Sequence, residues 1–172
     1  MKKTLWLGML LMTSGGAIAK TPVQAPPKAA TLAQMKSFAT LYAQGDKALA
    51  QRDMKLARLK MTPDFTLNLF GETIERAQYL SSMSDFFAQI IKVKSAKSTI
   101  EKLELRGKRM FVTATSTSEF TMSGEDKKPH LFKMVQRSLD VWIPTSRGWQ
   151  VQAVTALSER NFIDGKQVSA RP

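Results

Sequence analysis

The spacing of hydrophobic residues along this chain changes about halfway through it. Before Ser98, apolar side chains recur about every 3.6 residues, which is the period of a helix with one buried face. From Ser98 onward, apolar and polar residues alternate, as in a β-strand with one buried face. This order predicts an α+β domain in which helices pack on one face of an antiparallel sheet.

Capping signals place the predicted helices. Thr31 and Gln34 form a capping-box pattern at the start of the first helix, and Asp53 is suited to cap a short second helix that Pro63 ends. Residues 64–70 then predict a short strand or extended arm, and Thr73 is expected to cap a third helix. Its apolar positions form a wide face: Tyr79, Leu80, Met83, Phe86, Phe87 and Ile90.

The first predicted hairpin turns at Gly107-Lys108, where glycine in the first central position suits a type II′ turn. Leu105 then lies opposite Met110. The alternation that follows predicts an inward face made of Val112, Ala114, Ser116, Ser118 and Phe120.

A second hairpin is predicted around a five-residue turn at residues 144–148. With Ile143 opposite Trp149, the predicted pairs are Val141 with Val151, Leu139 with Ala153, and Arg137 with Thr155. This register directs Arg137 toward the helices. It places Trp142 on the outer face of the sheet, where an exposed tryptophan would indicate a partner surface. The polar loop at residues 123–129 leaves the register of the strand that follows Pro129 open by two residues.

The two ends of the chain read as segments outside the domain. Residues 1–19 have a basic start, a short apolar run and a small-x-small end, which predicts a signal peptide cleaved after Ala19 and a periplasmic or secreted protein that does not span the membrane. Residues 20–30 are proline-rich and predict a disordered leader. The domain is expected at residues 31–160, followed by a fraying tail at 161–172.

The chain is strongly basic and contains no cysteine. Its formal charge is +12, which in an exported protein fits either an anionic envelope surface or simply a soluble basic surface. Nothing in the sequence resembles a nucleic-acid-binding motif. The absence of cysteine excludes disulfides and thiolate metal sites, and the methionine spacing follows helix faces. No metal and no cofactor are therefore predicted.

The order of elements resembles the NTF2-like (SnoaL-like) superfamily over residues 31 to about 160. The resemblance rests on Gly45-Asp46, the joint at residues 62–65, Gly71, and Gly148-Trp149. It implies three helices enclosed by a curved sheet, a cone-shaped pocket, frequent dimers formed through the sheet, and members that are either enzymes or binding modules.

Two catalytic patterns of that superfamily are incomplete here. Members similar to steroid isomerase carry an acidic base just before the glycine that precedes the third helix, where this chain has residues 68–71 without a carboxylate. Dehydratase relatives use a His and Asp pair inside the cone, whereas the single histidine, His130, lies at the edge of a polar loop. The comparison favours a non-catalytic module.

Arg137 and Asp64 are the most informative charged candidates. An inward Arg137 would need a partner, which could be an anionic ligand or a structural pair with Asp64 or Glu72, or a shift of the strand could place it outside. Asp64 could act as a general base if it were buried, or could cap a turn.

The sequence therefore predicts a ligand-binding cavity lined by Tyr42, Tyr79, Phe86, Arg137 and Thr155. The favoured hypothesis is a binding or interaction module of the envelope for a small anionic or amphipathic ligand, with a homodimer formed through the outer face near Trp142. The alternatives are an isomerase- or lyase-type enzyme with Asp64 as base, and a scaffold subunit with a filled cone.

Overall fold

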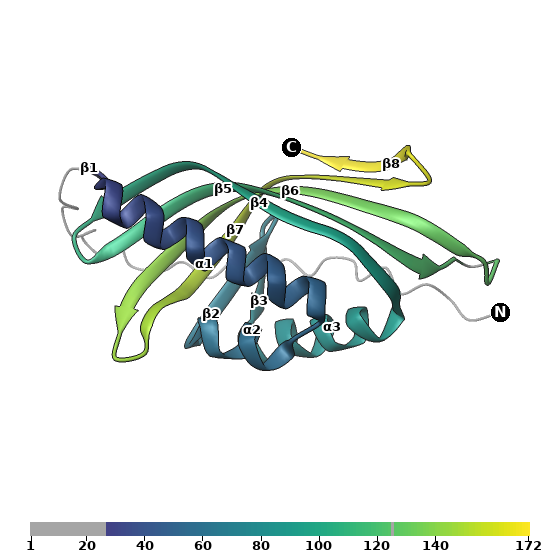
Figure 1. The fold of residues 1–172 in the computed structure, drawn as a ribbon, viewed down its shortest axis with the longest axis horizontal. Helices are drawn as coiled ribbons and strands as arrows, with labels where there is room; N and C mark the ends of the chain where they lie inside the picture. The colour runs from purple at the N-terminus through teal and green to yellow at the C-terminus, as the bar shows by residue number, and fades with distance from the viewer. Residues whose placement is uncertain (1–26, 125) are drawn as a thin grey trace, which may run out of the picture.

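The computed structural model describes residues 27–124 and 126–172 (Figure 1). The predicted signal peptide and most of the predicted leader lie outside the described residues. The helices are α1 (Leu32–Gln51), α2 (Met54–Lys60) and α3 (Arg76–Gln89). The strands are β1 (Lys28–Ala29), β2 (Met61–Leu69), β3 (Glu72–Glu75), β4 (Ile90–Arg106), β5 (Arg109–Ser123), β6 (Pro129–Thr145), β7 (Gly148–Ile163) and β8 (Lys166–Arg171).

All of these strands belong to one curved sheet, and the helices lie on one side of it (Figure 1). The strand order is β1-β4-β5-β6-β7-β2-β3. The predicted α+β architecture is confirmed, although the sheet is mixed because β2 runs parallel to β7. Along the free edge of β7, β2 pairs with its first half and β8 with its second half.

Two of the three predicted N-terminal caps are confirmed. Gln34 N donates to Thr31 Oγ1 at 3.3 Å, and Thr31 N donates to Gln34 Oε1 at 2.8 Å, which completes the capping box of α1. Asp53 caps α2, because its Oδ1 accepts from Leu56 N at 3.0 Å. Among the described helices, none is long and apolar enough to cross a membrane.

The third helix begins later than predicted. Thr73 does not cap it but lies in β3, and α3 has Glu75 at its N-cap without a side-chain hydrogen bond. The reason is a tight turn in which Phe70 and Gly71 both have positive φ, at 53° and 97°. This geometry is that of a hairpin turn, so residues 72–75 fold back on β2 instead of starting the helix.

The first long hairpin follows the prediction. Gly107 adopts φ of +60° at the turn, and Leu105 pairs with Met110. The inward residues Met110, Val112 and Ala114 are buried, in the alternation that the sequence predicted. The sheet begins earlier than expected, since β4 starts at Ile90.

The predicted register of the β6–β7 hairpin is wrong by one residue. The turn contains two residues rather than five, with Thr145 paired to Gly148 and Pro144 to Trp149. Thr145 Oγ1 tightens it by donating to Gly148 O at 2.9 Å and accepting from Arg147 N at 3.1 Å. A one-residue slip reverses the two faces of a strand.

Because of this reversal, Trp142 is buried and Arg137 is exposed, opposite to the prediction. Two irregularities in the β6–β7 pairing also shift β7, so Leu139 pairs with Thr155, Val141 with Ala153, and Arg137 with Ser158.

The C-terminal residues do not fray as predicted. β7 continues to Ile163, and an Asp164-Gly165 turn with φ of 49° and 80° leads into β8. Asp-Gly between two extended segments is a strong hairpin signal, which the sequence interpretation missed.

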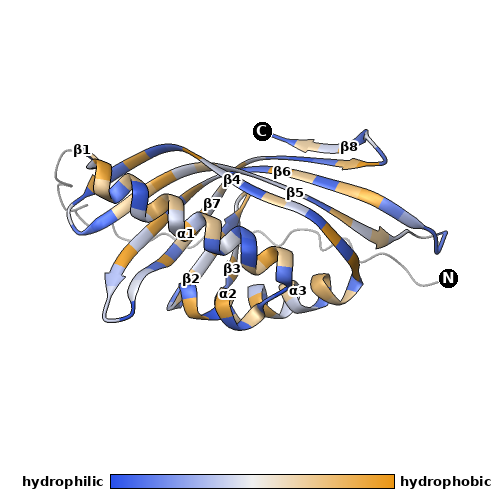
Figure 2. Ribbon diagram, in the orientation of Figure 1, coloured by the Kyte–Doolittle hydropathy of each residue, from blue (hydrophilic) through white to orange (hydrophobic). Residues whose placement is uncertain are grey.

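The main core lies between α1 and the sheet. Phe38 is fully buried, with its ring edge-on to Trp142 at a centroid distance of 5.7 Å. A second cluster around Phe87, Ile90 and Phe120 lies under α3. Figure 2 shows hydrophobic and hydrophilic residues alternating along the strands, which is why one sheet face accepts the helices.

Candidate ligand-binding cavity

A cavity of about 630 Å³ lies between the helices and the inner face of the sheet. All three helices contribute to its lining, together with β2, β3, β4, β5, β6 and β7, and most lining side chains are apolar or aromatic. Of the predicted lining residues, Tyr42, Tyr79 and Phe86 contact this cavity, whereas Arg137 and Thr155 do not.

The principal polar group in the cavity wall is Asp140 on β6. Its cross-strand neighbours are Val112 and Val154, and it is only 7% exposed. Tyr42 on α1 donates its hydroxyl to Asp140 Oδ2. Asp140 Oδ1 is buried and has no hydrogen-bond partner among the described residues. Because a buried carboxyl oxygen without a partner is costly, this atom marks the cavity as incomplete without a ligand or water.

Burial shifts the titration of these groups. It raises the pKa of Asp140, and the Tyr42 and Ser138 hydroxyls only partly oppose that rise. Burial and the Asp140 charge also raise the pKa of Tyr42 well above its usual value. The same two causes raise the pKa of Tyr79 to about 12, which indicates that Tyr79 lies within the field of Asp140.

A second polar group joins α1 to the sheet at the cavity wall. Asp46 accepts from Ser98 N at 2.8 Å and from Ser98 Oγ at 2.6 Å, and Ser98 Oγ lies 2.9 Å from Ser116 Oγ. All three residues line the cavity. Since every oxygen of this group has a partner, it holds the helix in place and does not demand a ligand.

Arg137 lies on the outer face of the sheet, with its side chain 47% exposed. Its Nε donates to Glu101 Oε2 at 2.8 Å, and Glu101 also accepts from Thr115. Of the alternatives considered for Arg137, the structure has the shifted strand that places this residue outside. Its partner is Glu101, not Asp64 or Glu72.

Asp64 is also outside the cavity. It is exposed on β2, where its Oδ2 accepts from Gln152 Nε2 at 2.8 Å. The hydrogen bond from Gln152 is the main cause that lowers the pKa of Asp64, whereas a general base at neutral pH needs a raised one.

The sequence interpretation missed Asp140 because it assigned that residue, with Trp142, to the outer face. A usable signal was present: Ser138, Asp140 and Trp142 alternate in phase, and a buried tryptophan would have carried the aspartate inside with it.

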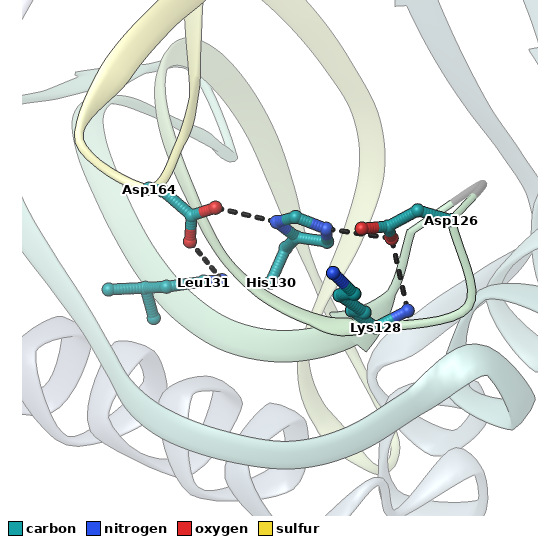
Figure 3. Close-up of polar contacts among 5 residues, drawn as sticks. All are labelled: Asp126, Lys128, His130, Leu131 and Asp164. Carbon is teal, nitrogen blue, oxygen red and sulfur yellow. Dashed lines mark hydrogen bonds and ion pairs between the residues drawn. The ribbon is translucent and has the colours of Figure 1, made fainter.

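His130 belongs to a separate cluster at the far end of the sheet (Figure 3). Its Nδ1 lies 2.6 Å from Asp164 Oδ2, and its Nε2 lies 2.9 Å from Asp126 Oδ1. Asp164 also accepts from Leu131 N, so the cluster joins the β5–β6 connection to the β7–β8 turn. Hydrogen bonds that the ring donates to Asp164 and Asp126 raise the pKa of His130. His130 does not line the cavity, and within the described residues no three His, Asp or Glu side chains are grouped to hold a metal ion.

Comparison with known proteins identifies structural neighbours only. No family model matches the chain, and no curated protein matches it. A candidate scytalone dehydratase from Novosphingobium aromaticivorans superposes with a TM-score of 0.64 at 9% identity, covering 81% of this chain and 87% of that one.

Two further neighbours have similar scores. An NTF2-like protein from Cytophaga hutchinsonii has a TM-score of 0.52 at 13% identity, covering 74% of this chain and 98% of that one. A candidate calcium/calmodulin-dependent kinase II association domain from Exiguobacterium sibiricum has a TM-score of 0.55 at 13% identity, covering 83% and 98%. At such identities the likeness concerns the fold alone.

Proposed function

Because this chain has the NTF2-like fold, we propose that its cavity binds a small, predominantly apolar molecule that carries one hydrogen-bonding group. The observation that supports this most directly is Asp140 Oδ1, a buried oxygen without a partner in the wall of a mostly apolar cavity. A ligand that bonds this oxygen would remove the cost of leaving it unpaired.

The size of the cavity suits this role. A volume of about 630 Å³ falls within the range of roughly 300–1,000 Å³ that is typical of small-molecule sites. The apolar wall supplies most of the binding free energy through burial, and the Tyr42–Asp140 pair orients the ligand.

The anionic ligand considered from the sequence loses its main support. Its cation was Arg137, which lies on the outer face, and the cavity presents the Asp140 carboxyl instead. The amphipathic alternative keeps its support, because the cavity combines a mostly apolar wall with an unpaired carboxyl oxygen at Asp140.

A matched pair of substitutions tests cavity binding. Val154 lines the cavity beside Asp140, whereas Val135 lies on the outer face, opposite Thr117 and Arg160. With diphenylhexatriene as a neutral fluorescent probe, we expect Val154→Phe to weaken binding at least tenfold and Val135→Phe to leave it unchanged. Equal binding by both variants would place the probe outside the cavity.

Proton-transfer catalysis is the second candidate function, and one observation favours it. The cavity holds a solvent-screened carboxyl next to a hydroxyl donor, an arrangement that can polarise a carbonyl group. In an isomerase- or lyase-type reaction, the protonated Asp140 would donate to the carbonyl oxygen and water would take the proton from the adjacent carbon, whereas Asp64, the base expected from the sequence, lies outside the cavity.

Deuterium incorporation into a cyclic ketone, followed by NMR in D₂O, tests this second candidate. We expect exchange above the buffer rate that Asp140→Asn and Tyr42→Phe both abolish. Exchange no faster than in buffer would remove proton transfer to ketones and leave binding alone.

We also propose a homodimer through the outer sheet face, with a different centre from the predicted one. Trp142 is buried and cannot contribute, but Leu139, Val141 and Ile143 alternate with the buried residues of β6 and so lie on the outer face. The association-domain neighbour supports the idea of assembly. Light scattering should give a dimer mass that Leu139→Arg halves, and a monomer for the unchanged protein would rule the dimer out.

A further inference from the structure

The charge of the cavity is opposite to that of the whole chain. The formal net charge is +12, yet four carboxylates and only two lysines contribute to the cavity lining. The lysines are Lys60 and Lys97, and neither is paired with Asp140 in the described residues. A ligand that enters this cavity therefore leaves a basic surface for an acidic interior.

Aromatic rings line the same cavity as the unpaired carboxyl. Tyr42 contacts Trp142 at a centroid distance of 5.9 Å, and Phe65 contacts Tyr79 at 5.3 Å. All four rings line the cavity. Aromatic faces attract cations through the ring quadrupole, and the attraction grows when the site is shielded from water.

Only one of the two oxygens of the Asp140 carboxyl has a hydrogen-bond partner among the described residues. Tyr42 donates to Oδ2. The Trp142 indole nitrogen is buried and has no hydrogen-bond partner among the described residues. It lies close enough to Tyr42 to act against the rise in the Tyr42 pKa. Oδ1 remains as a buried oxygen that needs a donor when the carboxyl is ionised. A cationic donor would form the hydrogen bond that Oδ1 lacks and would also be attracted by the aromatic faces.

We propose that the ligand is a hydrophobic amine whose ammonium group donates to Asp140 Oδ1 and lies against the rings of Tyr79 and Trp142. This inference rests on the proposed binding function and specifies its ligand class. The apolar body of the amine fills the remaining volume beneath the helices.

An amine fits better than the other two ligand types. A carboxylate would meet a second carboxyl in a low-dielectric site, which is strongly unfavourable. An alcohol could donate to Oδ1 but gains nothing from the aromatic faces and leaves the carboxyl charge uncompensated. An ammonium group compensates that charge, so the pair forms with both partners ionised.

Amine binding should then depend on pH through the titration of Asp140. Burial raises the pKa of Asp140, and the ammonium group pairs with the ionised carboxyl, so the affinity for the amine should fall as the pH drops through that raised pKa. The other polar or charged groups that line or face this space come from every surrounding element: Tyr42 and Asp46 on α1, Asp53 and Lys60 beside or on α2, Tyr79 on α3, Lys97 on β4, Ser138 on β6 and Glu159 on β7.

Three isosteric probes separate the ligand classes: 1-adamantylamine, 1-adamantanol and adamantane-1-carboxylate. We expect calorimetry at pH 7 to show the amine binding at least tenfold more tightly than the alcohol, and no binding of the carboxylate. As the pH is lowered through the raised pKa of Asp140, amine binding should weaken more than alcohol binding.

Two aspartate variants locate the anchor. Asp140→Asn should weaken the amine at least tenfold and leave the alcohol nearly unchanged. Asp64→Asn, which neutralises an exposed carboxylate outside the cavity, should leave both unchanged. If Asp140→Asn does not fold, the ratio of amine to alcohol affinity in the unchanged protein decides.

An alcohol that binds as tightly as the amine, or an Asp140→Asn variant that retains the amine, would overturn the inference and leave the proposed binding function intact. Failure of all three probes together with diphenylhexatriene would instead contradict the binding function itself.

Discussion

At the residue scale, Asp140 is the position where folding and function conflict. A carboxyl group that is buried with one unpaired oxygen destabilises the fold once it is ionised. A purely structural position would more often hold an apolar residue. The retained carboxyl is therefore the group on which we base both proposals.

Asp140→Asn should stabilise the protein at neutral pH. The folded pKa of Asp140 is raised, so its favourable contribution is present below the unfolded value of 3.8 and is lost as the pH rises through the folded pKa. The asparagine stays neutral and avoids that loss. Circular dichroism melts should show a higher melting temperature at pH 7 and no advantage near pH 3, and a lower melting temperature at pH 7 would contradict the buried ionisable state.

The His130 cluster should titrate as a unit. Hydrogen bonds raise the pKa of His130 above 6.5 and lower the pKa values of Asp126 and Asp164 below 3.8. The cluster therefore adds stability below the unfolded histidine pKa, and that part is lost as the pH rises through the folded one. The stability contributed by Asp126 and Asp164 is present above pH 3.8 and is lost as the pH falls through the folded pKa values of these two carboxylates.

Proton NMR can follow His130 directly, because it is the single histidine of the chain. We expect its pKa above 6.5, with Asp164→Asn lowering it more than Asp126→Asn, since Asp164 is the larger cause. An unchanged pKa in both variants would mean that the cluster does not form in solution.

At the element scale, one face of β6 packs under the helices and the other is the outer face of the sheet. Ser138, Asp140 and Trp142 point under the helices, whereas Arg137 and Leu139 lie on the opposite face. The division follows from a two-residue turn, and a turn that shifted the register by one residue would reverse it.

Alanine substitutions on the two faces of β6 should differ sharply. Trp142→Ala removes a ring that packs against Phe38 and should cost about 3–5 kcal/mol in the free energy of unfolding. Arg137→Ala removes an exposed pair and should change it very little. Urea unfolding measures both, and a large effect at Arg137 with a small one at Trp142 would show that the register is wrong.

At the scale of the whole molecule, a basic surface encloses an acidic, aromatic cavity. Export remains a prediction from residues 1–19, and it decides which amines the protein would meet.

Expression of the full chain in a Gram-negative host tests export. We expect the protein in the periplasmic fraction, with a mature N-terminus at Lys20 because the predicted cleavage follows Ala19. Intact mass spectrometry and N-terminal sequencing measure this, and Ala19→Pro should block cleavage. An uncleaved chain in the cytosol would remove the envelope setting.

Local signals in the sequence determined much of this fold. The capping box at Thr31, the cap at Asp53 and the Gly107 turn each depend on residues within a few positions, so short patterns suffice to predict them. The face of β5 followed from its own alternation, and Tyr42, Tyr79 and Phe86 followed from helix stripes.

Only the tertiary structure decided which side of β6 faces the helices. That choice depends on the length of the β6–β7 turn and on pairing irregularities whose stability comes from packing against distant residues. Because the register differs by one residue from the expected one, Asp140 rather than Arg137 faces the cavity, and the cavity holds a buried acid where a cation was expected. The sequence therefore predicted a cavity, while long-range packing determined its chemistry.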